Sequence, residues 1–142
     1  MELTKEDYMA IIGEMAYKNI AGTDEANMRR CEREAQEEIS GYLRSIYDVA
    51  KIFSATGENR NPQIVMFMAD VTLYHLSASL PQKMGSEIRK ERYDRAIKWL
   101  EGVQSGKIVP DIPRATVLDK EGNSTEAGAF IYGSEKKLTH NW

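Results

Sequence analysis

The sequence predicts an all-α protein, a bundle of four to five helices with an extended C-terminal arm. Apolar residues recur at steps of three and four over most of residues 1–108, as amphipathic helices require. Beyond them this periodicity ends, and Pro110 and Pro113 interrupt helix formation. We therefore expect a helical domain in residues 1–108 and an arm in residues 109–142, in which a short β-hairpin could form.

Two helices are expected in the first third of the chain. The first begins at Thr4, a good N-cap, with Asp7 in its first turn. Gly13 could divide this helix, and Gly22 ends it. The second is expected over residues 24–47, with one narrow apolar stripe opposite a charged face. The stripe consists of Met28, Cys31, Ala35, Ile39, Tyr42, Leu43 and Ile46.

A third helix is the expected centre of the bundle. Asn61 is a good N-cap, Pro62 fits the first turn, and apolar residues then cover most sides of the helix. A helix that is apolar all round is typically buried. After a turn marked by Pro81 and Gly85, a fourth helix follows up to Gly106 as its C-terminal cap. Its inward stripe is expected to be Ile88, Tyr93, Ala96, Ile97, Leu100 and Val103, with Trp99 beside it in the core.

The arm contains two short strand-like runs, Arg114–Leu118 and Phe130–Tyr132, and a turn-like segment at Asp119–Asn123. A lone two-stranded hairpin is marginal in water. The arm therefore needs the bundle, or a neighbouring molecule, to order it. Large aromatic side chains are common interface anchors, so Trp142 could dock on another subunit or fold back on its own body.

No group of residues in the sequence indicates catalysis or a bound cofactor. Loops of the type that cradle nucleotides are missing. His75 is best explained as a hydrogen-bonded core residue, and Glu34, Glu37 and Glu38 as a solvated face, because the Glu-x-x-His pattern of di-metal bundles is lacking. Cys31, the single cysteine, is expected to be a reduced packing residue. We therefore expect no enzyme activity, no cofactor and no metal.

The charge distribution disfavours a primary grip on nucleic acid. Residues 1–50 carry 6 basic and 11 acidic side chains, a net charge of −5, and residues 51–142 carry a net charge of +2. Phosphate binding needs a basic face. The basic residues around Arg92 alternate with acidic ones. A helical DNA-binding regulator is therefore the alternative function, and a small enzyme a weaker one.

Membrane association is not expected either. No stretch reaches the roughly 20 apolar residues that a bilayer-spanning helix needs. The first residues lack the basic and then apolar pattern of a signal peptide. The protein is therefore expected to stay in the compartment in which it is made.

Several groups of residues resemble a family of tailed phages and prophages. They are Gly41-Tyr42-Leu43-Arg44 with Tyr47, Ala69-Asp70 with Tyr74, Arg92-Tyr93 with Ala96, Trp99-Leu100, and Ser105-Gly106-Lys107. Over residues 3–110 the chain is similar to the phage Mu-like neck family, which is associated with head completion and head–tail connection. These motifs are structural rather than catalytic.

The resemblance implies a structural virion protein, made in the bacterial cytoplasm and placed in the neck, at the head–tail interface. Such an adaptor forms a homo-oligomeric ring, expected to hold twelve subunits, beneath the portal protein. It contacts tail or neck proteins, and DNA passes through its lumen. A channel that passes DNA should not bind phosphates tightly, in agreement with the net negative charge of residues 1–50. The expected interface residues lie in the arm: Phe130, Ile131, Tyr132, Lys136, Lys137, His140 and Trp142.

Overall fold

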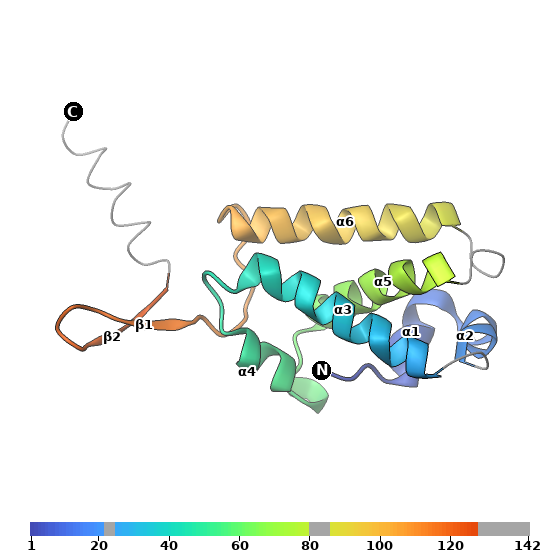
Figure 1. Ribbon diagram of the computed structural model, residues 1–142, viewed down its shortest axis with the longest axis horizontal. Coiled ribbons are helices and arrows are strands. Elements are labelled where there is room, and N and C mark those ends of the chain that lie inside the picture. The colour runs from blue at the N-terminus through green and yellow to red at the C-terminus, as the bar shows by residue number, and fades with distance from the viewer. Residues whose placement is uncertain (22–24, 80–85, 128–142) are drawn as a thin grey trace.

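The computed structural model describes residues 1–21, 25–79 and 86–127, and these residues are predominantly helical (Figure 1). The elements are α1 (Lys5–Ile12), α2 (Glu14–Ala21), α3 (Glu25–Leu43), α4 (Val49–Ser54), the 3₁₀ helix η1 (Gly57–Asn59), α5 (Pro62–Ser79), α6 (Ser86–Gln104), β1 (Thr116–Leu118) and β2 (Ser124–Glu126). The all-α prediction is confirmed. The described residues form six α-helices instead of four or five, because Gly13 divides the first predicted helix and the unpredicted α4 follows α3.

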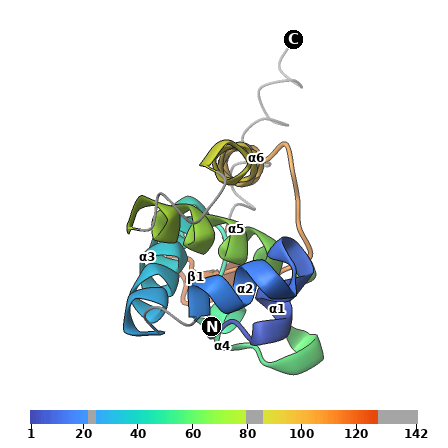
Figure 2. The ribbon, with the colours of Figure 1, turned by 90° about the vertical axis from the view of Figure 1, so that its right-hand side faces the viewer.

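Helix α5 is the centre of the bundle, as predicted. It packs against α1, α3 and α6, and α6 lies on one side of the layer that α3 and α5 form (Figure 2). The side chain of Asn61 caps α5, because its Oδ1 accepts hydrogen bonds from the backbone N–H groups of Gln63 and Ile64 at 3.0 and 3.1 Å. Residues on every side of α5 are buried, including Ile64, Phe67, Met68, Val71, Leu73 and Leu76. Burying an apolar side chain of this size contributes about 1.5–3 kcal/mol, so α5 contributes strongly to the stability of the bundle.

The N-terminal helices begin where their capping residues predict. Thr4 and Asp7 form a reciprocal capping box, in which each side chain accepts a hydrogen bond from the backbone N–H of the other residue. Gly13 has a φ of 80°, a conformation that favours glycine, and it separates α1 from α2. The predicted stripe of α3 is confirmed: five of its members are buried, and Tyr42 and Ile46 are half-buried.

Two boundaries differ from the prediction. Helix α3 ends at Leu43 rather than at Tyr47, and Tyr47 instead forms an isolated β-bridge with Arg114. In α6 the expected inward residue Ile88 is 53% exposed, and Arg89 is buried in its place. The reason is helical phase: Arg89, Ala96 and Val103 are seven residues apart and therefore share a face, and Ile88 lies off it.

The chain leaves α6 by a sharp turn and runs back to the bundle before it forms the hairpin. Gly106 has a φ of 81°, which confirms it as the C-terminal cap. The backbone N–H of Asp48 donates to the carbonyl of Pro113, and that of Ala115 donates to the carbonyl of Ile46, both at 2.9 Å. These two bonds fix the direction in which the arm departs from the bundle.

Strands β1 and β2 form an antiparallel hairpin that projects from the bundle beyond the C-terminal end of α6 (Figure 1). The turn at Asp119–Asn123 is confirmed, because Asp119 Oδ1 accepts hydrogen bonds from the backbone N–H groups of residues 121 and 123. The strand that pairs with β1 was not predicted. The partner of β1 is Ser124–Glu126, which follows directly after the turn, and Phe130–Tyr132 lies outside the described residues.

Candidate assembly surfaces

Metal-ligating and nucleophilic side chains are the groups that could support chemistry. Within residues 1–21, 25–79 and 86–127, no three His, Cys, Asp or Glu side chains lie close enough to hold a metal ion. Cys31 is a buried free thiol whose pKa is raised, chiefly by burial, which confirms its role as a packing residue. In the same part of the chain, no helix combines the length and the apolar content that crossing a bilayer requires.

The charged groups inside the bundle connect helices. Asp70, on α5, is fully buried and accepts two hydrogen bonds from Arg92 on α6, at 2.6 Å from Nε and 3.3 Å from Nη2. Arg89 is 8% exposed, and within the described residues its Nη1 has no hydrogen-bond partner. Burial, with the nearby charge of Arg92, lowers the pKa of Arg89. This helix interface therefore contains one carboxylate and two guanidinium groups.

A second buried carboxylate joins α1 to α3. Tyr8 donates a hydrogen bond from its hydroxyl to Glu32 Oε1 at 2.6 Å, and Arg29 binds the other carboxylate oxygen at 2.8 Å. Burial, together with the hydrogen bond and the charge of Glu32, raises the pKa of Tyr8 well above its ordinary value. Tyr8, Arg29 and Glu32 therefore form one hydrogen-bonded group that joins α1 to α3.

The third polar cluster joins α3, α5 and α6 around Glu38. His75 Nε2 lies 2.7 Å from Glu38 Oε2, and the hydroxyl of Tyr93 donates to Glu38 Oε1. The ring of Tyr74 stacks on that of Tyr93, with 4.0 Å between centroids. The prediction that His75 is a hydrogen-bonded residue is confirmed. The prediction that Glu38 belongs to a solvated face is wrong, because it is half-buried and bonded to both neighbouring helices.

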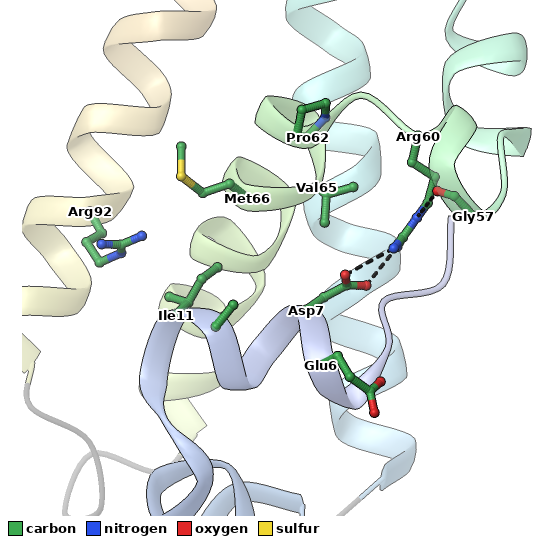
Figure 3. A pocket seen from close by; sticks show the side chains of 10 residues that line it. Glu6, Asp7, Ile11, Gly57, Arg60, Pro62, Val65, Met66 and Arg92 are labelled. Carbon is green, nitrogen blue, oxygen red and sulfur yellow. Dashed lines mark hydrogen bonds and ion pairs between the residues drawn. The ribbon is translucent and has the colours of Figure 1, made fainter.

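A pocket of about 450 Å³ opens between α1, α5 and α6 (Figure 3). Ile11, Pro62, Val65 and Met66 contribute its apolar walls, and Ala10, Glu6, Asp7, Gly57, Arg60 and Arg92 complete its lining. Asp7 and Arg60 form a two-pronged ion pair at its edge, with distances of 2.7 and 3.1 Å. Asp7 is thus paired with Arg60, and Arg92 is paired with Asp70, so these charged groups connect neighbouring elements of the fold.

A second hollow, of about 600 Å³, lies on the C-terminal half of α6, and we call it the α6 groove. Its lining is Arg95, Lys98, Trp99, Glu101, Gly102, Ser105, Lys107 and Ile108. Gly102 lets Ile108 pack closely on the helix, because a Cβ at Gly102 would lie 2.6 Å from Ile108 Cδ1. Trp99 packs on Phe67 of α5, with ring centroids 4.9 Å apart, which confirms its predicted place in the core.

The hairpin is the third outward surface. Its apolar side chains are not covered: Val117 is 41% and Leu118 is 75% exposed. Arg114 anchors the base of the hairpin, with its guanidinium 5.7 Å from the centroid of the Tyr47 ring and with a hydrogen bond to the carbonyl of Ala127. The hairpin is therefore held firmly at one end and offers apolar side chains at the other.

The interface residues that the sequence suggested lie outside the described residues and stay predictions. They are Phe130, Ile131, Tyr132, Lys136, Lys137, His140 and Trp142. The predicted strand-like run Arg114–Leu118 contains β1, but neither β2 nor the hollow of the α6 groove was predicted. Strand β2 has three residues, too few for the alternation that usually reveals a strand.

The fold and its surfaces define a small α-helical bundle with a projecting β-hairpin. The chain belongs to the phage protein family described as Bacteriophage Mu, Gp36, whose family model matches residues 2–127. The resemblance to a phage Mu-like family is thereby confirmed, and the match extends through the hairpin. Neither a curated protein nor a solved structure matches the chain. Membership identifies a phage protein and supports a structural or morphogenetic role associated with the virion.

Proposed function

We propose that this protein is a head–tail connector subunit, which forms a homo-oligomeric ring beneath the portal protein in the neck of the virion. It binds the portal on one side and tail or neck proteins on the other, and it needs neither a cofactor nor catalysis. The observation that carries this proposal is family membership over nearly the whole chain. The projecting hairpin with its uncovered apolar side chains supports it.

Ring formation is consistent with the outward surfaces of the bundle. A head-to-tail contact needs two different complementary surfaces on each subunit, and it closes into a ring when the rotation between copies allows. The α6 groove and the hairpin come from different elements and differ in shape and charge. We take twelve as the number of copies that matches the portal.

The acidic first third of the chain suits a lumen through which DNA passes. Residues 1–50 carry a net charge of −5, and strong phosphate contacts would slow a moving polymer. The exposed side of α3 includes Glu34 and Glu37. An assembled ring with lysine and arginine side chains dominating its lumen would contradict this part of the proposal.

The test uses the full chain with the portal protein of the same phage. Native mass spectrometry of the two together should show a complex with several copies of this chain per portal. In cells infected with phage that lacks the gene for this protein, filled heads without tails should accumulate. Supplying the protein from a plasmid should restore complete virions. A chain that does not associate with the portal, or virions that form without it, would overturn the connector assignment.

The arm is tested separately by deleting residues 128–142. The truncated chain should keep the helical circular dichroism and melting temperature of the full chain, but should no longer join particles. A full-length chain with Met15→Ser is the control, because Met15 is 82% exposed and lies on α2, away from the arm. Infectious virions built with the truncated protein would show that the arm assignment is wrong.

The alternative, a DNA-binding regulator, has one observation in its favour. Arg95, Lys98 and Lys107 line one hollow of the surface. A regulator would bind duplex DNA with an affinity that falls steeply as salt rises. Titrations of the protein with duplex DNA at 50 and 200 mM salt distinguish a regulator from a connector subunit. For a connector subunit, we expect no measurable DNA binding at 200 mM salt.

A further inference from the structure

The hairpin exposes apolar side chains on both of its faces. Val117 and Leu118 are consecutive in β1, and successive side chains of a strand point to opposite faces. Each face of the hairpin therefore carries one exposed apolar side chain beside polar ones. An isolated two-stranded sheet is marginal in water, so its exposed apolar side chains favour a covering surface.

The hairpin is also acidic. Asp119, Glu121 and Glu126 outnumber Lys120, which gives residues 116–126 a net charge of −2. A covering surface with matching chemistry would combine an apolar floor with basic edges. In a heterologous contact, charge complementarity also fixes orientation and disfavours incorrect partners.

The α6 groove has that chemistry. Its charged lining is Arg95, Lys98 and Lys107 against Glu101, a net charge of +2. Trp99 and Ile108 contribute the apolar floor, and Gly102 allows Ile108 to lie close to the helix. The groove and the hairpin thus match in charge and in apolar character.

The hairpin is directed away from the groove of its own chain. The backbone bonds from Asp48 to Pro113 and from Ala115 to Ile46 hold the base of the arm on the α3–α4 side of the bundle. From that base, the hairpin extends away from the bundle, past the end of α6 (Figure 1). The groove and the hairpin lie toward the same end of the molecule. Copies related by rotation about a ring axis could therefore place the hairpin of one copy beside the groove of the next.

We propose that the hairpin of each copy seats in the α6 groove of the next copy, as the head-to-tail contact of the ring. Leu118 would cover the floor at Trp99 and Ile108, and Glu121 would approach Lys98 or Lys107. This inference rests on the proposed connector function, and it assigns that function a particular interface.

Paired cysteines test the contact in the full chain assembled with the portal protein. We choose Leu118→Cys on the hairpin and Ser105→Cys in the groove, both at exposed positions. Under mild oxidation, the doubly substituted chain should give a ladder of disulfide-linked species up to the full ring. A mixture of the two single variants should give dimers alone, because each disulfide then needs one chain of each kind. The native Cys31 is buried and should not take part.

The matched control combines Leu118→Cys with Met15→Cys, which is equally exposed but lies on α2. This control should give less than one tenth of the disulfide-linked oligomers that the Leu118→Cys and Ser105→Cys chain gives. Dimers of the Leu118→Cys variant alone would indicate a symmetric contact and would overturn the head-to-tail assignment. A portal complex that forms without the Leu118–Ser105 ladder would overturn the inference and leave the connector function standing. No portal complex at all would overturn both.

Charge reversal gives an independent measurement. Lys98→Glu should weaken assembly at least tenfold. Adding Glu121→Lys to the same chain should restore most of the assembly, because both charges of each contact between residues 98 and 121 are then reversed. Both sites are exposed, so the melting temperature should not change. Equal assembly by the single variant and the wild-type chain would show that the groove is not part of the contact.

Discussion

The helical bundle and the hairpin differ in where their charged and apolar side chains lie. In the bundle, carboxylates such as Asp70 and Glu32 are buried and bonded to side chains from other helices. In the hairpin, Lys120, Glu121 and Glu126 are exposed, and so are Val117 and Leu118. The difference teaches that folding stability lies in the bundle. Substitutions in the bundle should change the free energy of unfolding, and substitutions in the hairpin should change association.

The largest effect is expected from removing the buried carboxylate between α5 and α6. Asp70→Asn keeps the shape of the side chain but leaves Arg92 and Arg89 without a negative charge inside the bundle. Breaking a buried ion pair in this way costs about 3 kcal/mol. Urea unfolding followed by circular dichroism measures the change.

The control for that experiment is Asp94→Asn, which removes the exposed partner of Lys90 on the same helix. Exposed pairs contribute less than about 1 kcal/mol. Equal losses for the two variants would contradict the view that burial of the carboxylate, rather than its charge alone, stabilises the bundle.

Much of the bundle could be predicted because its signals are local and periodic. Asn61 and Thr4 mark helix starts, Gly13 and Gly106 mark helix ends, and the stripe of α3 follows steps of three and four. The buried pairs could not be predicted in the same way. Asp70 and Arg92 are 22 residues apart in the sequence, and only the packing of α5 on α6 brings them together.

The hairpin was harder to predict than the bundle for a related reason. Its turn was found because Asp119 carries a local signal, a side chain that caps its own turn. Its second strand, Ser124–Glu126, has no apolar residue. The strand was therefore predicted at the apolar run Phe130–Tyr132 instead. The α6 groove was missed because it depends on the return of Ile108 onto Gly102, which is tertiary geometry.

The next effect in size concerns Asp7, which caps α1 and binds Arg60 beside η1 (Figure 3). Burial alone would raise the pKa of Asp7, but the hydrogen bonds from Arg60 and Thr4 outweigh burial and hold it below its ordinary value of 3.8. A carboxyl with a lowered pKa in the folded state stabilises the fold above its unfolded pKa. That contribution is lost as pH falls through the folded pKa.

Asp7→Asn should therefore reduce the free energy of unfolding by about 1–2 kcal/mol at pH 7. The difference from the wild-type chain should shrink as pH falls below about 4. Denaturant unfolding at pH 7, 5, 4 and 3 measures it. Glu6→Gln is the control, because Glu6 is an exposed neighbour in the same turn of α1. A deficit that stays constant down to pH 3 would contradict the assigned role of the Asp7 carboxylate.

Arg89 should respond in the opposite direction. Its guanidinium is buried, and its Nη1 lacks a hydrogen-bond partner in the part of the chain that the structure describes. Replacing a poorly paired buried charge by an apolar side chain of similar length is neutral or stabilising. Arg89→Met should therefore leave the free energy of unfolding unchanged or raise it by about 1 kcal/mol. Thermal unfolding of the two chains measures the change, and a loss of more than about 1 kcal/mol would show that Arg89 stabilises the bundle.

The smallest effect on global stability is expected at the base of the hairpin. Arg114 contacts the Tyr47 ring of the bundle and donates a hydrogen bond to the carbonyl of Ala127, directly after β2. The Tyr47 ring is buried and Arg114 is half-buried. A cation–π contact contributes about 0.5–2 kcal/mol, and here it stabilises the hairpin against local opening. Arg114→Met should change the free energy of unfolding by less than about 0.5 kcal/mol. It should speed amide hydrogen exchange in residues 116–126 several-fold and leave exchange in α5 unchanged. Lys120→Met, at the exposed turn, should alter neither. Faster exchange in α5 after Arg114→Met would show that the hairpin and the bundle unfold together, and the division between a stabilising bundle and an adhesive hairpin would then be wrong.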